Sequence, residues 1–298
     1  MIGKKPIRYV LSTSQKIWKT QSMCDEKMEF RKITVNEFPY VSYLCLWGVS
    51  RKQKEAMKEH MEKKLKWIEE MMSKGLEIIV ALGPRKSKKG LIEYLPIEIA
   101  PEPIEGENSL FINCVWVLPR HWKKDIGKRL MQCFLKDAKK VGGSTVLTYE
   151  GDKWFGYFEY MPAKFFRKFG FEEASRDGNR LLLHLDLGAH QLPRLLMPKR
   201  REIEKGDMKT LDVFCNSQCP WCGWMIDRIK KNITKYPNVK VNVINTDSRE
   251  TIRKFGIARG VSIDGKPLIN RMATWKEIES TLEKEYNPTN TNQQARLT

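Results

Sequence analysis

The nine residues LFINCVWVL at positions 110–118 form the clearest strand in the chain. Their nearly unbroken apolar and β-branched character predicts a strand that is buried on both faces of a sheet. A basic loop over 119–124 follows, and the apolar spacing over 126–140 predicts an amphipathic helix that ends at Gly142 and Gly143. A strand that runs through a loop into a helix N-terminus presents free backbone amides, which indicates an anion-binding site.

The predicted anion site draws on the end of the strand, the basic loop and the first turn of the helix. Its candidate residues are Val115, Trp116, Val117, Lys123, Lys124, Asp125, Ile126, Gly127 and Lys128. Gly127 lets a phosphate approach the backbone closely. Asp125 stands where it can cap the helix, but its charge opposes an anion, and the nearby lysines offset that charge only in part.

The segments on either side complete a domain that we place at residues 28–187. Helices are expected over 36–45, 50–73 and 163–169, and strands over 30–34, 76–82, 90–99, 144–149 and 180–186. This domain resembles the GNAT superfamily of N-acetyltransferases, which use acetyl-CoA. The stretch 126–130 resembles the end of the family's pyrophosphate-binding motif, the helix that stops at Gly170-Phe171 resembles a later motif, and 90–94 resembles its central strand. The resemblance implies an α/β fold (α+β, a mixed sheet with flanking helices) and acetyl-CoA as cofactor.

The resemblance also implies roles for single residues. Glu93 is the candidate general base, because the family often uses a carboxylate from its central strands, and Tyr149 is the candidate acid. Phe166 stands where many members carry a tyrosine beside the cofactor's thiol, and Asp125 replaces a glycine of the family's motif. The amides of 115–117 would polarise the thioester carbonyl. For Glu93 and Tyr149 a purely structural role remains the alternative.

Residues 188–208 read as a linker, and a second domain is expected over 209–286. It begins with an apolar strand, 211–215, followed by Cys219-Pro220-Trp221-Cys222 and an amphipathic helix over 223–235. The later pattern is a strand over 239–245, a helix over 249–255, two strands around Asp264-Gly265 and a helix over 275–285. This order makes the domain similar to a thioredoxin- or glutaredoxin-like βαβαββα fold. The resemblance implies that Cys219 attacks and Cys222 resolves a mixed disulfide. A thiol at a helix N-terminus is expected to favour the reactive thiolate.

Two features of this second domain depart from that family. The place of its cis-proline falls at Arg259 or Gly260, which puts general oxidoreductase activity in doubt. Cys215, with Cys219 and Cys222, leaves a zinc or iron–sulfur site as an alternative, although a fourth ligand is missing and no metal is expected. An acetyltransferase domain followed by such a module is the layout of the YoaP-type acetyltransferases, which the chain resembles.

Composition sets the remaining limits. The chain has 298 residues, a formal net charge of +18 and seven cysteines, and no apolar run long enough for a membrane span. We expect a cytoplasmic protein without membrane contacts, with a basic N-terminal extension over 1–27 and a polar tail over 287–298. The basic residues near 120–140 are also consistent with an ordinary solvated surface or with nucleic-acid binding.

The leading functional prediction is transfer of an acetyl group from acetyl-CoA to an amine, with the second domain recognising or reducing a thiol-bearing substrate. The acceptor is expected to be a small-molecule or peptide amine or thiol. One alternative is a thiol–disulfide oxidoreductase whose first domain has lost acetyl transfer. Another is a basic protein that binds RNA or a protein partner.

Overall fold

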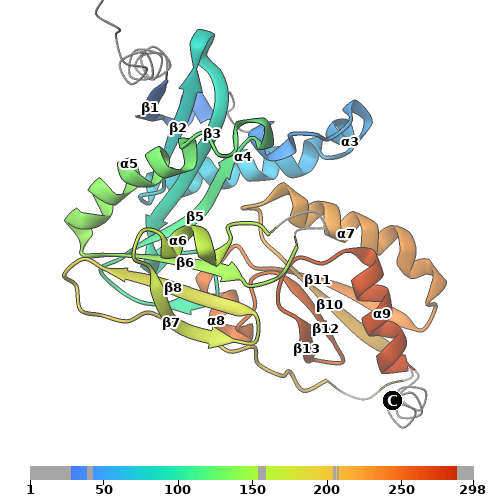
Figure 1. Cartoon of the computed structure of the whole chain (residues 1–298). Coiled ribbons are helices and arrows are strands. Elements are labelled where there is room, and N and C mark those ends of the chain that lie inside the picture. The colour runs from blue at the N-terminus through green and yellow to red at the C-terminus, as the bar shows by residue number, and fades with distance from the viewer. Residues whose placement is uncertain (1–27, 39–42, 154–158, 204–205, 207, 287–298) are drawn as a thin grey trace, which may run out of the picture.

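The computed structural model describes residues 28–286 apart from 39–42, 154–158, 204–205 and 207. The predicted extension over 1–27 and tail over 287–298 lie outside the described residues. Two separate sheets form two units that pack against each other (Figure 1). No helix within the described ranges is long and apolar enough to cross a membrane.

The first unit is a seven-stranded mixed sheet in the order β1-β2-β3-β5-β6-β8-β7. Its strands are β1 (Glu29–Lys32), β2 (Glu77–Gly83), β3 (Ser87–Pro96), β5 (Leu110–Val117), β6 (Gly143–Tyr149), β7 (Glu172–Asp177) and β8 (Arg180–Asp186). Its helices are α3 (Arg51–Ala56), α4 (Lys58–Ser73), α5 (Ile126–Val141) and α6 (Ala163–Arg167). The neighbours pair antiparallel except β5 and β6, which run parallel.

Helices cover both faces of this sheet, which explains why its central strands are apolar throughout. Trp67, Ile68 and Met71 of α4 pack in one core with Ile78 and Val80 of β2. The alternate residues of β2, Ile79 and Ala81, face the other core, which holds Leu130, Met131 and Phe134 of α5. Successive strand residues point to opposite faces, so one strand serves both cores.

The parallel strands β5 and β6 stay together for only a short distance. They pair over Leu110–Ile112 and Ser144–Val146, and no pairing continues beyond Ile112 although both strands run on. The strands therefore diverge, and within the described part of the chain the 115–117 end of β5 has no strand neighbour on that side. This divergence opens the sheet at its centre.

Most predicted elements are present, and the structure corrects several of them. In place of one helix over 36–45, the structure has 3-10 turns at Val35–Glu37 and Tyr43–Leu46 on either side of the undescribed 39–42. The helix predicted over 50–73 is broken at Met57, where the backbone leaves the helical region. The predicted linker contains β9 (Arg194–Leu195), which pairs with β4 (Ile104–Glu105) of the first unit.

The second unit is a four-stranded sheet in the order β11-β10-β12-β13 with three helices. Its elements are β10 (Lys209–Cys215), α7 (Pro220–Asn232), β11 (Val239–Asn245), α8 (Arg249–Phe255), β12 (Gly260–Ile263), β13 (Lys266–Ile269) and α9 (Trp275–Tyr286). The central strand β10 runs parallel to β11 and antiparallel to β12. The strand–CPWC–helix order predicted from sequence is present, with α7 starting earlier than expected, directly after Cys219.

The two units share a close interface. Helix α7 lies against α4, where His60 Nε2 and Asp227 Oδ2 are 2.6 Å apart (Figure 1). Arg249 at the start of α8 donates to the backbone carbonyls of Ala100, Glu102 and Ile104, at 3.0, 2.6 and 2.6 Å. These contacts fix the second unit over the diverging strands of the first.

Candidate active site between the two units

A groove of about 760 Å³ follows the free end of β5. One wall is the backbone and side chains of 115–117, and the other is the first turn of α5 with Phe165 and Phe169 around α6. A Cβ atom placed on Gly127 would lie 3.4 Å from the Phe165 ring, so a larger residue there would narrow the groove. Most of the residues from which the sequence predicts an anion site thus line one cavity.

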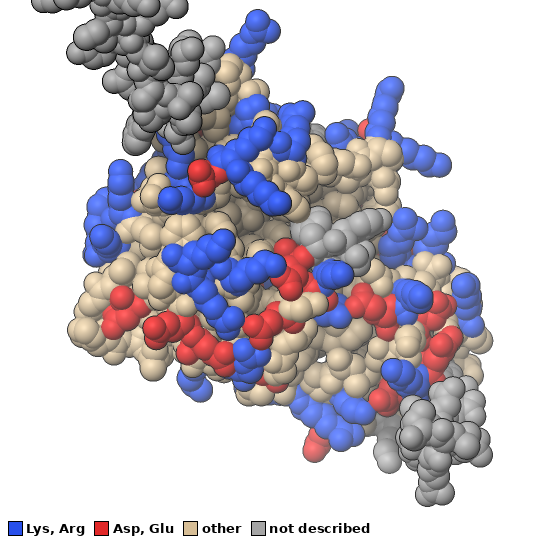
Figure 2. Space-filling model, viewed as in Figure 1, with Lys and Arg blue, Asp and Glu red and all other residues tan. Residues whose placement is uncertain are grey.

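The groove has the features of an anion site. The first-turn amides of the sixteen-residue helix α5 lack intrahelical acceptors and point toward it. Lys123, Lys128, Lys164 and Lys168 line its rim. Figure 2 shows Lys and Arg side chains gathered on the face where Figure 1 places α5 and α6.

Asp125 does not cap this helix, contrary to the interpretation of the sequence. It sits at the N-cap position, but its side chain makes no capping hydrogen bond, and its φ of 55° is left-handed. A Ser, Thr or Asp cap normally has extended backbone, which this residue lacks. The left-handed geometry explains why a glycine suits this position better.

Two of the residues predicted to line the groove lie elsewhere. Lys124 is absent from its lining, and Phe166 is fully buried in the core beneath α6. Phe166 stacks edge-to-face on Phe165 and Phe171, so the neighbouring Phe165 faces the groove instead. Neighbouring residues on a helix point in different directions, so Phe166 faces the core while Phe165 faces the groove. The sequence alone did not show which of the two rings would face the groove.

The groove adjoins a second cavity of about 770 Å³, hereafter the chamber, which lies between the two units. Trp116, Trp122 and Tyr160 line both spaces. The first unit supplies the chamber's Glu93 and Lys64, and the second unit supplies Cys219 and Trp221. The predicted base therefore faces a space large enough for a small molecule, directly beside the groove.

Glu93 is held by a chain of hydrogen bonds that begins in the second unit. Arg259 Nη1 donates to Gln218 Oε1 at 2.6 Å, and Gln218 Nε2 donates to Asn113 Oδ1 at 2.5 Å. Asn113 Nδ2 donates in turn to Glu93 Oε2 at 3.0 Å, and Lys64 Nζ donates to Glu93 Oε1 at 3.0 Å. The Arg259 guanidinium at one end and the Glu93 carboxylate at the other fix the orientation of the Gln218 and Asn113 side-chain amides. Each of the four hydrogen bonds above therefore joins a donor to an acceptor.

Lys64 and Glu93 form a buried ion pair. Their side chains are 3% and 0% exposed. Burial alone lowers the pKa of Lys64, but neighbouring Cys45 and Glu93 raise it well above its ordinary value, so the lysine stays charged. The pair is neutral overall, which reduces the cost of placing two charges in the interior.

Tyr160 stands at the meeting point of the cavities, and sequence reasoning missed it. It lines the groove, the chamber and a third, smaller cavity of about 80 Å³. Its hydroxyl donates to Cys114 Sγ at 2.8 Å, and burial raises its pKa well above the ordinary value, so it stays protonated. The only sequence signal was a lone tyrosine just before the Met-Pro that opens α6.

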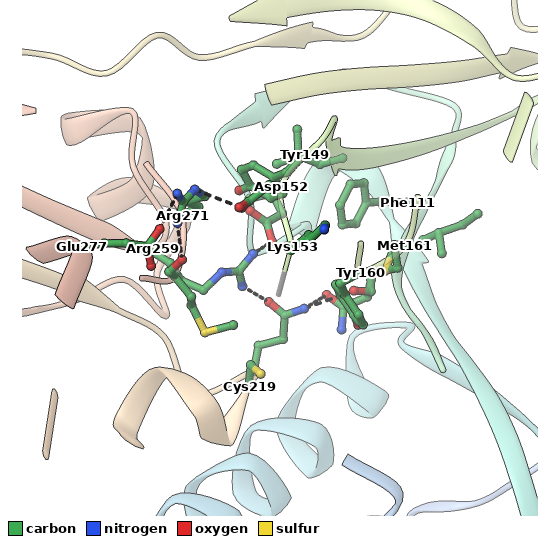
Figure 3. Close-up of a pocket in the computed structure, with 16 residues that line it drawn as sticks. Phe111, Tyr149, Asp152, Lys153, Tyr160, Met161, Cys219, Arg259, Arg271 and Glu277 are labelled. Carbon is green, nitrogen blue, oxygen red and sulfur yellow. Dashed lines mark hydrogen bonds and ion pairs between the residues drawn. The ribbon is translucent and has the colours of Figure 1, made fainter. Parts of the chain in front are cut away.

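Tyr149, the predicted acid, faces the third cavity and not the groove. Figure 3 shows it on the same side as Asp152, away from Cys219. Burial raises its pKa to about 12, and its hydroxyl lies 3.4 Å from the carbonyl oxygen of Asn270. Tyr149 therefore points toward the second unit rather than toward the end of β5.

The cysteine pair differs from its prediction. Cys219 is the N-cap of α7, but burial raises the pKa of its thiol to about 12, so the expected thiolate is wrong. Desolvation outweighs the helix dipole at this site. Cys222 is fully buried in the core of the second unit, where burial raises its pKa as well. Cys219 faces the chamber and the third cavity, whereas Cys222 lines neither.

Arg259 occupies the place that the resemblance assigned to a proline. It is committed to Gln218 and to an ion pair with Glu102 and does not activate the thiol. Among the described residues, no three His, Cys, Asp or Glu side chains are grouped so as to hold a metal, and Cys215 joins no such group.

Comparison with known proteins agrees with this geometry. Residues 49–171 match the model of the acetyltransferase (GNAT) family. The uncharacterized N-acetyltransferase YoaP of Bacillus subtilis (strain 168) is 28% identical over 249 residues, which cover 81% of this chain and 93% of that protein.

The solved structures that resemble this chain have low sequence identity to it. The PaiA N-acetyltransferase of Thermoplasma acidophilum in complex with coenzyme A is 18% identical, covering 53% of this chain and 98% of its own, with a TM-score of 0.38. A GNAT acetyltransferase of Brucella melitensis in complex with acetyl-CoA is 20% identical, covering 54% and 88%, with a TM-score of 0.34. Residues 49–171 are therefore similar to the acetyltransferase (GNAT) family, and most of the chain is similar to the B. subtilis relative.

Proposed function

We propose that the protein transfers an acetyl group from acetyl-CoA, bound in the groove, to an amine bound in the chamber. The observation that carries this proposal is the divergence of β5 and β6 after Ile112, which places a helix N-terminus and a free strand end around one groove. The amides of α5 and the lysines of the rim suit a pyrophosphate. Acetyl-CoA would supply a thioester carbonyl that an amine can attack.

The residues of the chamber suit the proton transfers that this reaction needs. Glu93 would accept the proton of the attacking amine, because each carboxylate oxygen keeps a second lone pair after its bond to Lys64 or Asn113. Tyr160 would donate to the departing thiolate, because it is protonated and lines both cavities. The amides of 115–117 would stabilise the carbonyl oxygen.

We also propose that the second domain has a thioredoxin-like fold, supported by its central β10 lying between parallel β11 and antiparallel β12. Its main role would be to close the chamber. The thiol with a pKa near 12 and the buried Cys222 favour this role over disulfide exchange, which needs an accessible thiolate.

Calorimetric titration with acetyl-CoA tests the proposal. We expect saturable binding by the natural protein and a loss of about tenfold or more in Lys128→Glu, which reverses a charge at the helix N-terminus. Lys139→Glu is the matched control, because this exposed lysine lies on the same helix away from the groove. Absence of saturable binding by the natural protein would refute the proposal, and so would equal losses in both variants.

A further inference from the structure

The chamber is walled largely by indole rings. Among the described residues, five tryptophans line it: Trp47, Trp116, Trp122, Trp221 and Trp224. Trp47 and Trp122 are 44% exposed and stand at its mouth, while Trp221 is held in the wall by a hydrogen bond from Nε1 to the Cys45 carbonyl at 3.1 Å. Such a wall offers flat apolar surfaces from both units of the protein.

The chamber carries no net charge. Among the described residues that line it, only Lys64 and Glu93 are charged, and they are paired with each other. No arginine lines it, and its single lysine is committed, so a phosphorylated acceptor finds no partner. A polyamine needs several carboxylates, and the overall charge of +18 repels it before it arrives.

Three cysteine thiols add to the apolar, uncharged wall of the chamber. Cys45, Cys114 and Cys219 all face the chamber. Burial raises the pKa of each thiol, so all three are neutral at physiological pH and behave as small apolar groups. An apolar wall also lowers the pKa of an enclosed ammonium, which favours the neutral amine that must attack.

From these observations, and resting on the proposed acetyl transfer, we infer that the acceptor is a primary amine carried on a flat apolar body, of the arylalkylamine class. The ring would lie between the indoles, with its amine directed to Glu93 and Tyr160, where the chamber meets the groove. Trp221 makes the second domain a determinant of acceptor specificity.

Equilibrium binding to the CoA-saturated protein tests this inference without any chemistry. By calorimetric titration, we expect tryptamine and 2-phenylethylamine to bind about a hundredfold more tightly than spermidine or glucosamine, since a buried ring gains roughly 2–3 kcal/mol over a polar body. Equal or stronger binding of spermidine or glucosamine would overturn the inference.

Two variants locate the site. Trp221→Ala should weaken tryptamine binding about tenfold, and Trp221→Phe should restore most of it, with acetyl-CoA affinity unchanged in both. Because Trp221 joins the two units, Trp47→Ala at the exposed mouth serves as a second variant whose folding is not at risk, and a severalfold loss is expected there. Unchanged tryptamine binding in both alanine variants would refute the assignment.

Release of CoA thiol from acetyl-CoA in the presence of each amine separates the inference from the function on which it rests. Faster release with tryptamine than with spermidine supports both. Tight tryptamine binding without any release would leave the ligand class standing and overturn acetyl transfer. Faster release with spermidine or glucosamine would overturn the ligand class and leave acetyl transfer standing.

Discussion

At the scale of single residues, the anion site proposed in the groove includes a negatively charged residue in strained backbone geometry. Asp125 holds a φ of 55° at the entrance of α5, and Lys123 beside it has a φ of 59°. L-residues pay up to about 1–2 kcal/mol for this geometry, Asn and Asp less than the others, whereas glycine adopts it freely.

Replacement of Asp125 should therefore improve the site. Asp125→Asn keeps the backbone preference and removes the charge, so we expect acetyl-CoA to bind about threefold to tenfold more tightly. Asp125→Gly should add a rise in melting temperature of a few degrees as the backbone strain is relieved. Calorimetry and thermal unfolding measure the two effects separately; weaker acetyl-CoA binding by Asp125→Asn would show that the carboxylate serves the cofactor.

Cys219 gives a pH prediction with a definite sign. The folded pKa of about 12 lies above the ordinary value of 9.0, so the thiol is neutral in both states below about pH 9. Above that pH the unfolded chain ionises first, and folding stability is lost as the pH rises toward 12. At pH 8, iodoacetamide should alkylate Cys219 roughly thirtyfold more slowly than in the urea-unfolded protein, followed by peptide mass spectrometry. If the alkylation rate of folded Cys219 reached half of its maximum below pH 8, the raised pKa of this buried thiol would be contradicted.

Site residues that are close in the chain could be predicted from the sequence, whereas residues that meet only through tertiary packing could not. Val115 and Gly127 belong to one local strand–loop–helix unit, so their shared cavity followed from chain order. Lys64, Gln218 and Tyr160 come from separate elements and meet only through tertiary packing. The reactivity of Cys219 was predicted wrongly because helix position is readable from sequence, whereas desolvation by another domain is not.

At the scale of elements, β5 receives hydrogen bonds from two different domains along one edge. Up to Ile112 its neighbour is β6, and at Asn113 the carbonyl accepts instead from Gln218 Nε2 at 3.3 Å. The same Gln218 also holds the Asn113 side chain, and Arg259 fixes which end of the Gln218 amide donates.

We expect Gln218→Glu to impair acetyl transfer about as much as Gln218→Ala, because a carboxylate accepts from Arg259 but cannot donate to Asn113. Each should lower the free energy of unfolding by about 1–3 kcal/mol and lower kcat, with KM for acetyl-CoA unchanged. Asn216→Ala is the control, since Asn216 contacts Arg259 and Pro101 without reaching Glu93. Full activity in Gln218→Glu would disprove this positioning role, which steady-state kinetics and urea unfolding together measure.

Element prediction succeeded where periodicity was strong and failed where it was absent. Strand β11 and helix α8 lie where apolar spacing placed them. Strand β7, with the sequence EEASRD, was missed because this edge strand has almost no apolar residue to reveal it. The break at Met57 was missed because its side chain is fully buried and keeps the apolar spacing of an unbroken helix.

At the scale of the whole molecule, the two units should unfold together. Arg249 satisfies three carbonyls of the first unit from the second, and removing it leaves those acceptors without this donor. We expect Arg249→Ala to lower the melting temperature and to separate one calorimetric transition into two. Arg253→Ala on the same helix loses only an exposed ion pair with Glu105 and should cost less than about 1 kcal/mol. Two transitions in the natural protein would show that the units are independent.

Both units supply residues to the wall of the chamber, and this has a consequence for how the acceptor specificity of such a protein can change. The carboxylate proposed as the base and the groove proposed for the cofactor belong to the first unit, while Trp221 and Trp224 belong to the second. Substitutions along α7 can therefore change the residues around the acceptor without changing Glu93 or the residues of the groove. Part of the acceptor specificity is thus encoded in the second segment of the gene, and changes in α7 that leave Gln218 and Arg259 in place would adapt the first segment to a different amine.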